Sequence, residues 1–72
     1  MQNQPQTPKE WLLYALKEYQ ISLLADNGDK VQIENGYEVE IEQNGIFKLK
    51  HEGKVVAPFV DLDELCGFLQ YR

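Results

Sequence analysis

Four glycines recur at intervals of eight or nine residues, at positions 28, 36, 45 and 53. Three of them directly follow an asparagine. Gly and Asn readily adopt the left-handed backbone conformation that tight turns need, so these pairs mark the ends of strands. Turn signals at this spacing are typical of short antiparallel strands joined in sequence order. The sequence therefore predicts a β-meander that starts near residue 20 and ends near residue 59.

Side-chain alternation decides the length of the loops between these strands. A two-residue turn at residues 44–45 would place Ile41 opposite Lys48, which mixes apolar and charged side chains on one face. A three-residue loop at residues 43–45, with its glycine left-handed, pairs Ile41 with Phe47 instead. The apolar face is then continuous, so we expect three-residue loops.

The same loop form gives apolar pairs across every turn. The predicted pairs are Val39 with Leu49, Ile33 with Tyr37, Leu49 with Val55, Phe47 with Ala57, and Leu23 with Val31. The opposite face supports these registers independently, because they set residues of opposite charge against each other. These charged pairs are Lys30 with Glu40, Glu40 with Lys48, and Glu38 with Lys50. Pro58 lacks an amide donor, so the strand at residues 54–59 is expected to lie at the border of the sheet.

A capping signature predicts a helix that begins at Pro8, with Thr7 as the N-cap and Glu10 as its capping-box partner. One side of this helix is apolar and is expected to face the core, through Leu12, Ala15, Leu16 and Tyr19. Ile21 falls about 180° from this stripe, so we expect the helix to end near Tyr19 and a strand to begin at Gln20. The alternative is one helix from Pro8 to about Asp26, followed by four strands.

A second capping signature predicts a C-terminal helix after Asp61, with Glu64 three residues further on. Val60 and Leu65 are placed to form a hydrophobic staple across the cap. The predicted core stripe of this helix consists of Leu62, Leu65, Cys66 and Leu69.

The expected fold class is therefore α+β: an N-terminal helix, an antiparallel meander of four or five strands, and a C-terminal helix, with both helices on one face of the sheet. A chain of 72 residues has room for one domain, and we assign it to residues 7–72. Residues 1–6 are rich in Gln and Asn and are expected to form a disordered tail.

Charge and cysteine content reduce the range of expected partners and compartments. A net charge of −5 opposes binding to nucleic acid or to an anionic membrane surface. The longest apolar run, residues 11–16, is far shorter than the roughly 20 residues that span a bilayer. A single cysteine cannot form an internal disulfide, so the expected location is cytoplasmic.

Catalytic candidates are few in this sequence. His51 falls at a predicted turn with no nucleophile beside it, and Cys66 lies on an apolar helix stripe where a buried structural thiol is common. No set of residues has the spacing of metal ligands, and neither a metal nor another cofactor is expected. An enzyme or small-ligand binder that uses His51 or Cys66 is the alternative function, and it requires both to converge in a concave pocket.

The outer side of the first helix and the border of the sheet are the candidate interaction surfaces. Tyr14 lies nearly opposite Leu16 on the helical wheel and Trp11 lies on the flank, and outward aromatic side chains often mark an interface. The alternative is that both pack under the N-terminal tail or at the margin of the sheet. Val56 and Pro58 lie on the border strand, whose edge can pair with another chain. We therefore expect a small acidic protein without enzymatic activity that binds another protein or itself. A further alternative is an acidic decoy for a basic or DNA-binding protein, which requires a contiguous uncompensated carboxylate surface.

Overall fold

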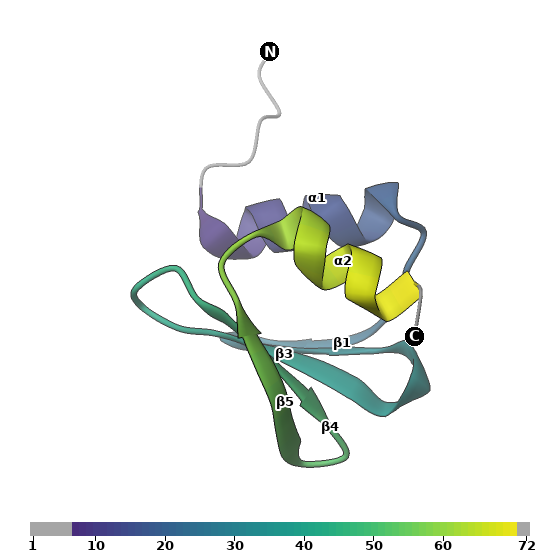
Figure 1. Cartoon of the computed structure of the whole chain (residues 1–72). Helices are drawn as coiled ribbons and strands as arrows, with labels where there is room; N and C mark the ends of the chain where they lie inside the picture. The colour runs from purple at the N-terminus through teal and green to yellow at the C-terminus, as the bar shows by residue number, and fades with distance from the viewer. Residues whose placement is uncertain (1–6, 71–72) are drawn as a thin grey trace.

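A computed structural model describes residues 7–70 of the chain, which form two helices and five strands in the predicted α+β order. The elements are α1 (Pro8–Glu18), β1 (Leu23–Asn27), β2 (Lys30–Ile33), a 3₁₀ turn (Glu34–Gly36), β3 (Tyr37–Ile41), β4 (Phe47–His51), β5 (Lys54–Phe59) and α2 (Leu62–Gln70). The strands form an open antiparallel sheet in the order β1-β2-β3-β4-β5. Both helices lie on one face of this twisted sheet, as expected (Figure 1). The tail predicted at residues 1–6 lies outside the described residues, as do residues 71–72.

Helix α1 begins and ends at local hydrogen bonds that its sequence can supply. The Thr7 hydroxyl accepts a hydrogen bond from the Glu10 amide at 3.1 Å, which confirms the predicted N-cap. At the other end, the amides of Gln20 and Ile21 donate to the carbonyls of Lys17 and Leu16, at 3.0 and 2.8 Å. This pair of bonds is a Schellman motif, with Gln20 left-handed at φ 59° where glycine is usual.

The Schellman motif corrects the predicted start of the sheet. Strand β1 begins at Leu23, not at Gln20, and the alternative of a helix that continues to Asp26 is wrong. Ile21 is buried, at 7% exposed, because the residue two positions beyond a Schellman cap packs back against the last turn of its helix. Its apolar character therefore reflects helix termination rather than strand alternation.

The two central hairpins have the predicted register. Lys30 lies opposite Glu40 across β2 and β3, and Ile41 lies opposite Phe47 across β3 and β4. The loop between β3 and β4 has three residues, closed by a hydrogen bond from the Glu42 amide to the Ile46 carbonyl at 2.9 Å. Its glycine has φ 83°, as the bulged loop requires.

The two outer hairpins differ from the prediction. Leu23 pairs with Ile33 rather than with Val31, because the turn has two residues, 28–29, and β1 contains a bulge. Leu49 pairs with Ala57 rather than with Val55, because Glu52-Gly53 forms a two-residue turn and a bulge interrupts β5. Both residues of this turn have positive φ, 51° and 85°, as a type I′ turn needs. Each bulge absorbs one residue, which changes the pairing on both sides of it.

The core lies between the helices and the inner face of the sheet. The buried residues are Leu12, Leu16, Ile21, Val31, Ile33, Tyr37, Val39, Phe47, Leu49, Leu65 and Cys66. The predicted core stripes of both helices are confirmed, with their remaining members partly buried against this cluster. Val60, however, is 74% exposed, so the predicted staple with Leu65 does not bury it. Asp61 caps α2 as predicted, and its carboxylate accepts a hydrogen bond from the Asp63 amide at 2.8 Å.

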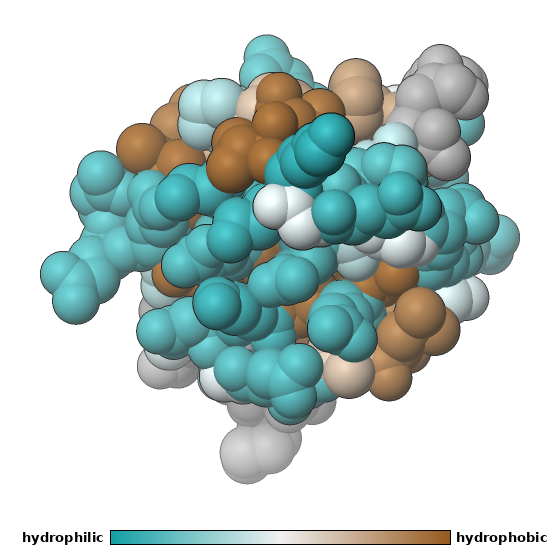
Figure 2. Space-filling model, turned by 90° about the horizontal axis from the view of Figure 1, so that it is seen from below, coloured by the Kyte–Doolittle hydropathy of each residue, from teal (hydrophilic) through white to brown (hydrophobic). Residues whose placement is uncertain are grey.

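The outer face of the sheet is polar and internally compensated. Lys50 and Glu40 form an ion pair at 3.0 Å, and Lys48 and Glu42 form one at 2.8 Å. These contacts run diagonally between β3 and β4, although the residues directly opposite each other are those predicted. Figure 2 shows this face as predominantly hydrophilic, with hydrophobic surface mainly at its margins.

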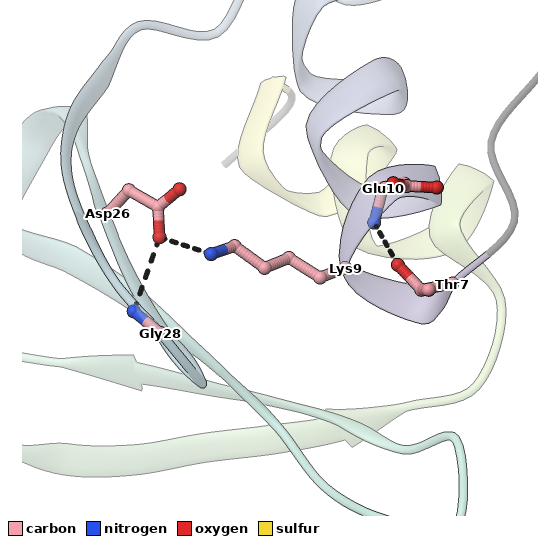
Figure 3. A network of polar contacts seen from close by, with 5 residues as sticks. All are labelled: Thr7, Lys9, Glu10, Asp26 and Gly28. Carbon is pink, nitrogen blue, oxygen red and sulfur yellow. Dashed lines mark hydrogen bonds and ion pairs between the residues drawn. The ribbon is translucent and has the colours of Figure 1, made fainter. Parts of the chain in front are cut away.

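Specific polar contacts connect the helices to each other and to the sheet. Lys9 of α1 forms an ion pair with Asp26 of β1, whose carboxylate also accepts a hydrogen bond from the Gly28 amide (Figure 3). At the other end of α1, the Gln70 side chain donates to the Tyr19 carbonyl at 2.7 Å. These contacts connect α1 to β1 and to α2 at the edge of the core.

Candidate functional site

Trp11 and Tyr14 are half-exposed aromatic residues of α1. Their exposed fractions are 48% and 49%, whereas Leu12 and Leu16 of the same helix are fully buried. The two rings meet edge to face, with centroids 6.2 Å apart and planes at 87°. Both aromatic side chains therefore reach solvent, while Trp11 also lies at the margin of the sheet beside Gly45 and Phe47.

A groove between the helices begins at this aromatic pair. We call it the interhelical groove; its volume is about 270 Å³. From α1 it is lined by Trp11, Tyr14, Ala15, Glu18 and Tyr19, and from the start of α2 by Asp61, Leu62 and Asp63. It exists because α1 and α2, which come from opposite ends of the sequence, pack side by side (Figure 1).

A second, more open groove lies on the other side of Trp11. It has a volume of about 560 Å³ and is lined by Pro8, Val60, Phe47 and Gly45, in addition to residues shared with the interhelical groove. The shared residues are Trp11, Asp61 and Leu62. Trp11 therefore contributes to the lining of both hollows.

Three acidic residues also line the interhelical groove. Glu18 is at the end of α1, while Asp61 and Asp63 are at the start of α2. The Tyr19 hydroxyl lies 3.2 Å from Asp63 Oδ1 and donates a hydrogen bond to it. Burial, and then this carboxylate, raise the pKa of the Tyr19 hydroxyl above its ordinary value. Among the described residues that line the groove, none is basic.

The predicted border residues do not join this site. Val56 and Pro58 are both exposed on β5, which is an edge of the sheet as predicted, but neither lines the two grooves around Trp11. The structure thus places the four candidate interface residues on two separate surfaces.

His51 is not the exposed loop residue that the sequence suggested. It is the last residue of β4 and is half-buried, with its ring centroid 4.4 Å from that of Tyr37. Its Nε2 atom lies 3.2 Å from the Asn35 carbonyl oxygen. The ring therefore ties the end of β4 to the 3₁₀ turn before β3.

Cys66 is fully buried in the core, as predicted. Burial raises the pKa of its thiol to about 11, and the nearby Asp63 carboxylate contributes in the same direction. At neutral pH such a thiol is protonated and shielded, which is typical of a structural cysteine. His51 contacts Tyr37 and Asn35 rather than this thiol.

The acidic decoy alternative needs an uncompensated carboxylate surface. On the outer face of the sheet, Glu40 and Glu42 are both ion-paired with lysines. The Lys50 ammonium, through its hydrogen bond, lowers the pKa of the Glu40 carboxyl, and Glu42 raises the pKa of Lys48. This surface is therefore compensated at Glu40 and Glu42.

The interhelical groove itself is absent from the sequence prediction. The sequence predicts Asp61 as the cap of α2, which is correct but incomplete, and it gives no binding role to Asp63. One signal was present: Trp11, Tyr14 and Glu18 follow at intervals of three and four and therefore share one side of α1. What the sequence could not show is that the start of α2 lies against that side.

Neither the metal-binding residue types nor the helices of the described region indicate a function. Within residues 7–70, no three His, Cys, Asp or Glu side chains are grouped so that they could hold a metal ion. Neither described helix is long and apolar enough to cross a bilayer. Searches against protein families, curated proteins and solved structures return no match. The function of this chain is therefore inferred from its own residues.

Proposed function

We propose that this chain is a cytoplasmic interaction module without enzymatic activity, and that it binds another protein through the surface around Trp11 and Tyr14. The observation that carries this proposal is the pair of half-exposed aromatic rings on α1, of which Trp11 lines two hollows and Tyr14 one. Aromatic residues at such positions supply much of the binding energy in protein interfaces, because they bury a large area with few rotatable bonds.

The other surfaces of the domain favour the same assignment. The outer face of the sheet is occupied by ion pairs between neighbouring strands. Both edge strands contain a bulge, and β5 also contains Pro58, features that oppose the addition of a further strand. Val56 and Pro58 are thus less suited to strand pairing than the sequence suggested, which leaves the aromatic surface as the preferred site.

The test is affinity capture from an extract of native cells, with quantitative mass spectrometry of the retained proteins. The variant is Trp11→Ser with Tyr14→Ser. The matched control is Leu24→Ser with Val55→Ser, because these residues are also apolar and exposed, at 66% and 58%, but lie on the edge strands. We expect the control to retain the partners of the wild type and the aromatic variant to lose them.

Circular dichroism and light scattering accompany the capture experiment. An unchanged circular dichroism spectrum shows that the loss of partners is not caused by unfolding. Light scattering measures self-association, the other form of binding expected from the sequence, on the same variants. Unchanged capture by the aromatic variant contradicts the proposal, as does unfolding of that variant, which would place Trp11 and Tyr14 in the core.

A further inference from the structure

The lining of the interhelical groove combines two features that both attract positive charge. The faces and edges of Trp11, Tyr14 and Tyr19 provide aromatic surface, and the carboxylates of Glu18, Asp61 and Asp63 provide negative charge. We propose that this groove receives a cationic side chain, lysine or arginine, from a basic segment of the partner protein. This inference rests on the proposed function and specifies the chemistry of the partner.

Cation recognition by aromatic rings has a direct physical basis. The negative face of an indole or phenol ring attracts an ammonium or guanidinium group within about 6 Å of the ring centroid. The aliphatic stem of the same side chain packs against apolar surface, which Ala15 and Leu62 supply in this groove. A lysine or arginine therefore matches both the charged and the apolar parts of the lining.

The backbone dipoles do not cancel the negative charge of the groove. The start of α2 contributes a partial positive charge and the end of α1 a partial negative charge, each of about half an elementary charge. Because the two helix ends border the same groove, these contributions oppose each other. The charge of the three carboxylates therefore dominates.

The lysine nearest to Trp11 in the sequence is already engaged elsewhere. Lys9 extends from α1 to Asp26 of β1 and forms an ion pair there (Figure 3). Lys48 and Lys50 are ion-paired on the outer face of the sheet. Because no described lysine lines the groove, a cation from a partner can complement its carboxylates.

Charge also favours a basic partner over a second copy of this chain. In a symmetric dimer formed through this surface, each acidic groove would lie near the same groove of the other copy. With a net charge of −5 per chain, the two copies repel each other as they approach. A basic segment is instead attracted, and its affinity decreases as salt screens the charges.

The test uses capped nonapeptides that differ only at one central residue beside a leucine in a Gly/Ser background. The central residue is arginine, lysine, citrulline, norleucine or glutamate; citrulline and norleucine are neutral counterparts of the two cations. Each peptide is titrated into the full chain, and binding is followed by the fluorescence of Trp11, the sole tryptophan, and by amide chemical shifts. We expect the arginine and lysine peptides to bind at least fivefold more tightly than their neutral counterparts.

Charge-neutralising variants locate the effect in the groove. Glu18→Gln with Asp63→Asn preserves side-chain size and is expected to weaken binding of the arginine peptide by about tenfold, at roughly three- to fivefold for each lost carboxylate. The matched control, Glu38→Gln with Asp29→Asn, has the same change in net charge but alters residues on β3 and on the turn after β1. We expect the control to bind as the wild type does.

Equal affinity for the arginine and citrulline peptides would overturn the proposed cation recognition. Equal weakening by both double variants would overturn it as well, because net charge rather than the groove would then control binding. The interaction surface itself is tested separately by the capture experiment with Trp11→Ser and Tyr14→Ser. A groove that binds neutral and charged peptides alike thus contradicts only the cation inference, whereas capture that does not depend on the aromatic pair contradicts the proposed function.

Discussion

Replacing Gln20 by glycine is predicted to stabilise the fold. Gln20 occupies the left-handed position of the Schellman motif at φ 59°, where a residue with a Cβ atom loses about 1–2 kcal/mol. Glycine removes this strain but raises the entropy of the unfolded chain, which costs about 0.4–1 kcal/mol. The expected net gain is about 0.5–1 kcal/mol, or an increase in Tm of roughly 3–6 °C for a domain of this size.

The assay compares Gln20→Gly with Gln20→Ala by urea denaturation, followed by the fluorescence of Trp11. The same pair of substitutions at the exposed helical residue Lys17 serves as the control. At Lys17 alanine is expected to be more stable than glycine by about 1 kcal/mol, whereas at Gln20 the order is reversed. If alanine is the more stable residue at both positions, the backbone there is not left-handed and the account of how α1 ends is wrong.

Three further predictions concern the core, the ion pairs and the thiol. In chemical denaturation, Leu49→Ala is expected to destabilise the fold by about 2–5 kcal/mol, because Leu49 is fully buried. Glu40→Ala is expected to destabilise it by less than about 1 kcal/mol. The reverse ranking would mean that the inner and outer faces of the sheet are exchanged. Hydrogen bonds from Lys9 and Lys50 lower the pKa of Asp26 and Glu40 in the folded state. These carboxylates therefore stabilise the fold above their ordinary pKa values, near 4. This stabilisation is lost as the pH falls through the lowered pKa values of the folded state. An acid titration of Asp26→Asn should therefore show a weaker decrease in stability than the wild type, and an unchanged profile would contradict the assigned ion pair. Because Cys66 is fully buried with a pKa of about 11, its alkylation by iodoacetamide is expected to occur only through opening of the fold; rapid labelling without denaturant would contradict this.

The sequence predicts the centre of the sheet better than its edges, and the reason is physical. Between β2 and β4 both faces carry a pattern, apolar on one side and alternating charge on the other, so that only one register satisfies both. In the outer hairpins, bulges allow one strand to contain an extra residue, and the exposed Leu24 and Val56 then follow neither face. Alternation alone cannot locate such a residue.

The candidate site, too, is only partly predictable from the sequence. The outward position of Trp11 and Tyr14 follows from helical periodicity within α1, a local property that the sequence contains. The interhelical groove depends on the contact between α1 and α2, which periodicity within either helix does not determine. Asp63 therefore becomes a groove residue only when the packing of the two helices is known.

The side-by-side packing of the two helices has a consequence for when binding becomes available during folding. Every strand pairs with its neighbour in the sequence, so the sheet can form by successive closure of short hairpins. The hydrogen bonds between the helices instead join residues 44 and 51 positions apart, which requires closure of a much longer loop. Because α2 follows all five strands in the sequence, the groove is absent from any nascent chain that lacks α2. A ligand of this groove binds only chains whose two helices have met, and it stabilises the complete fold by an amount that grows with the logarithm of its concentration above Kd.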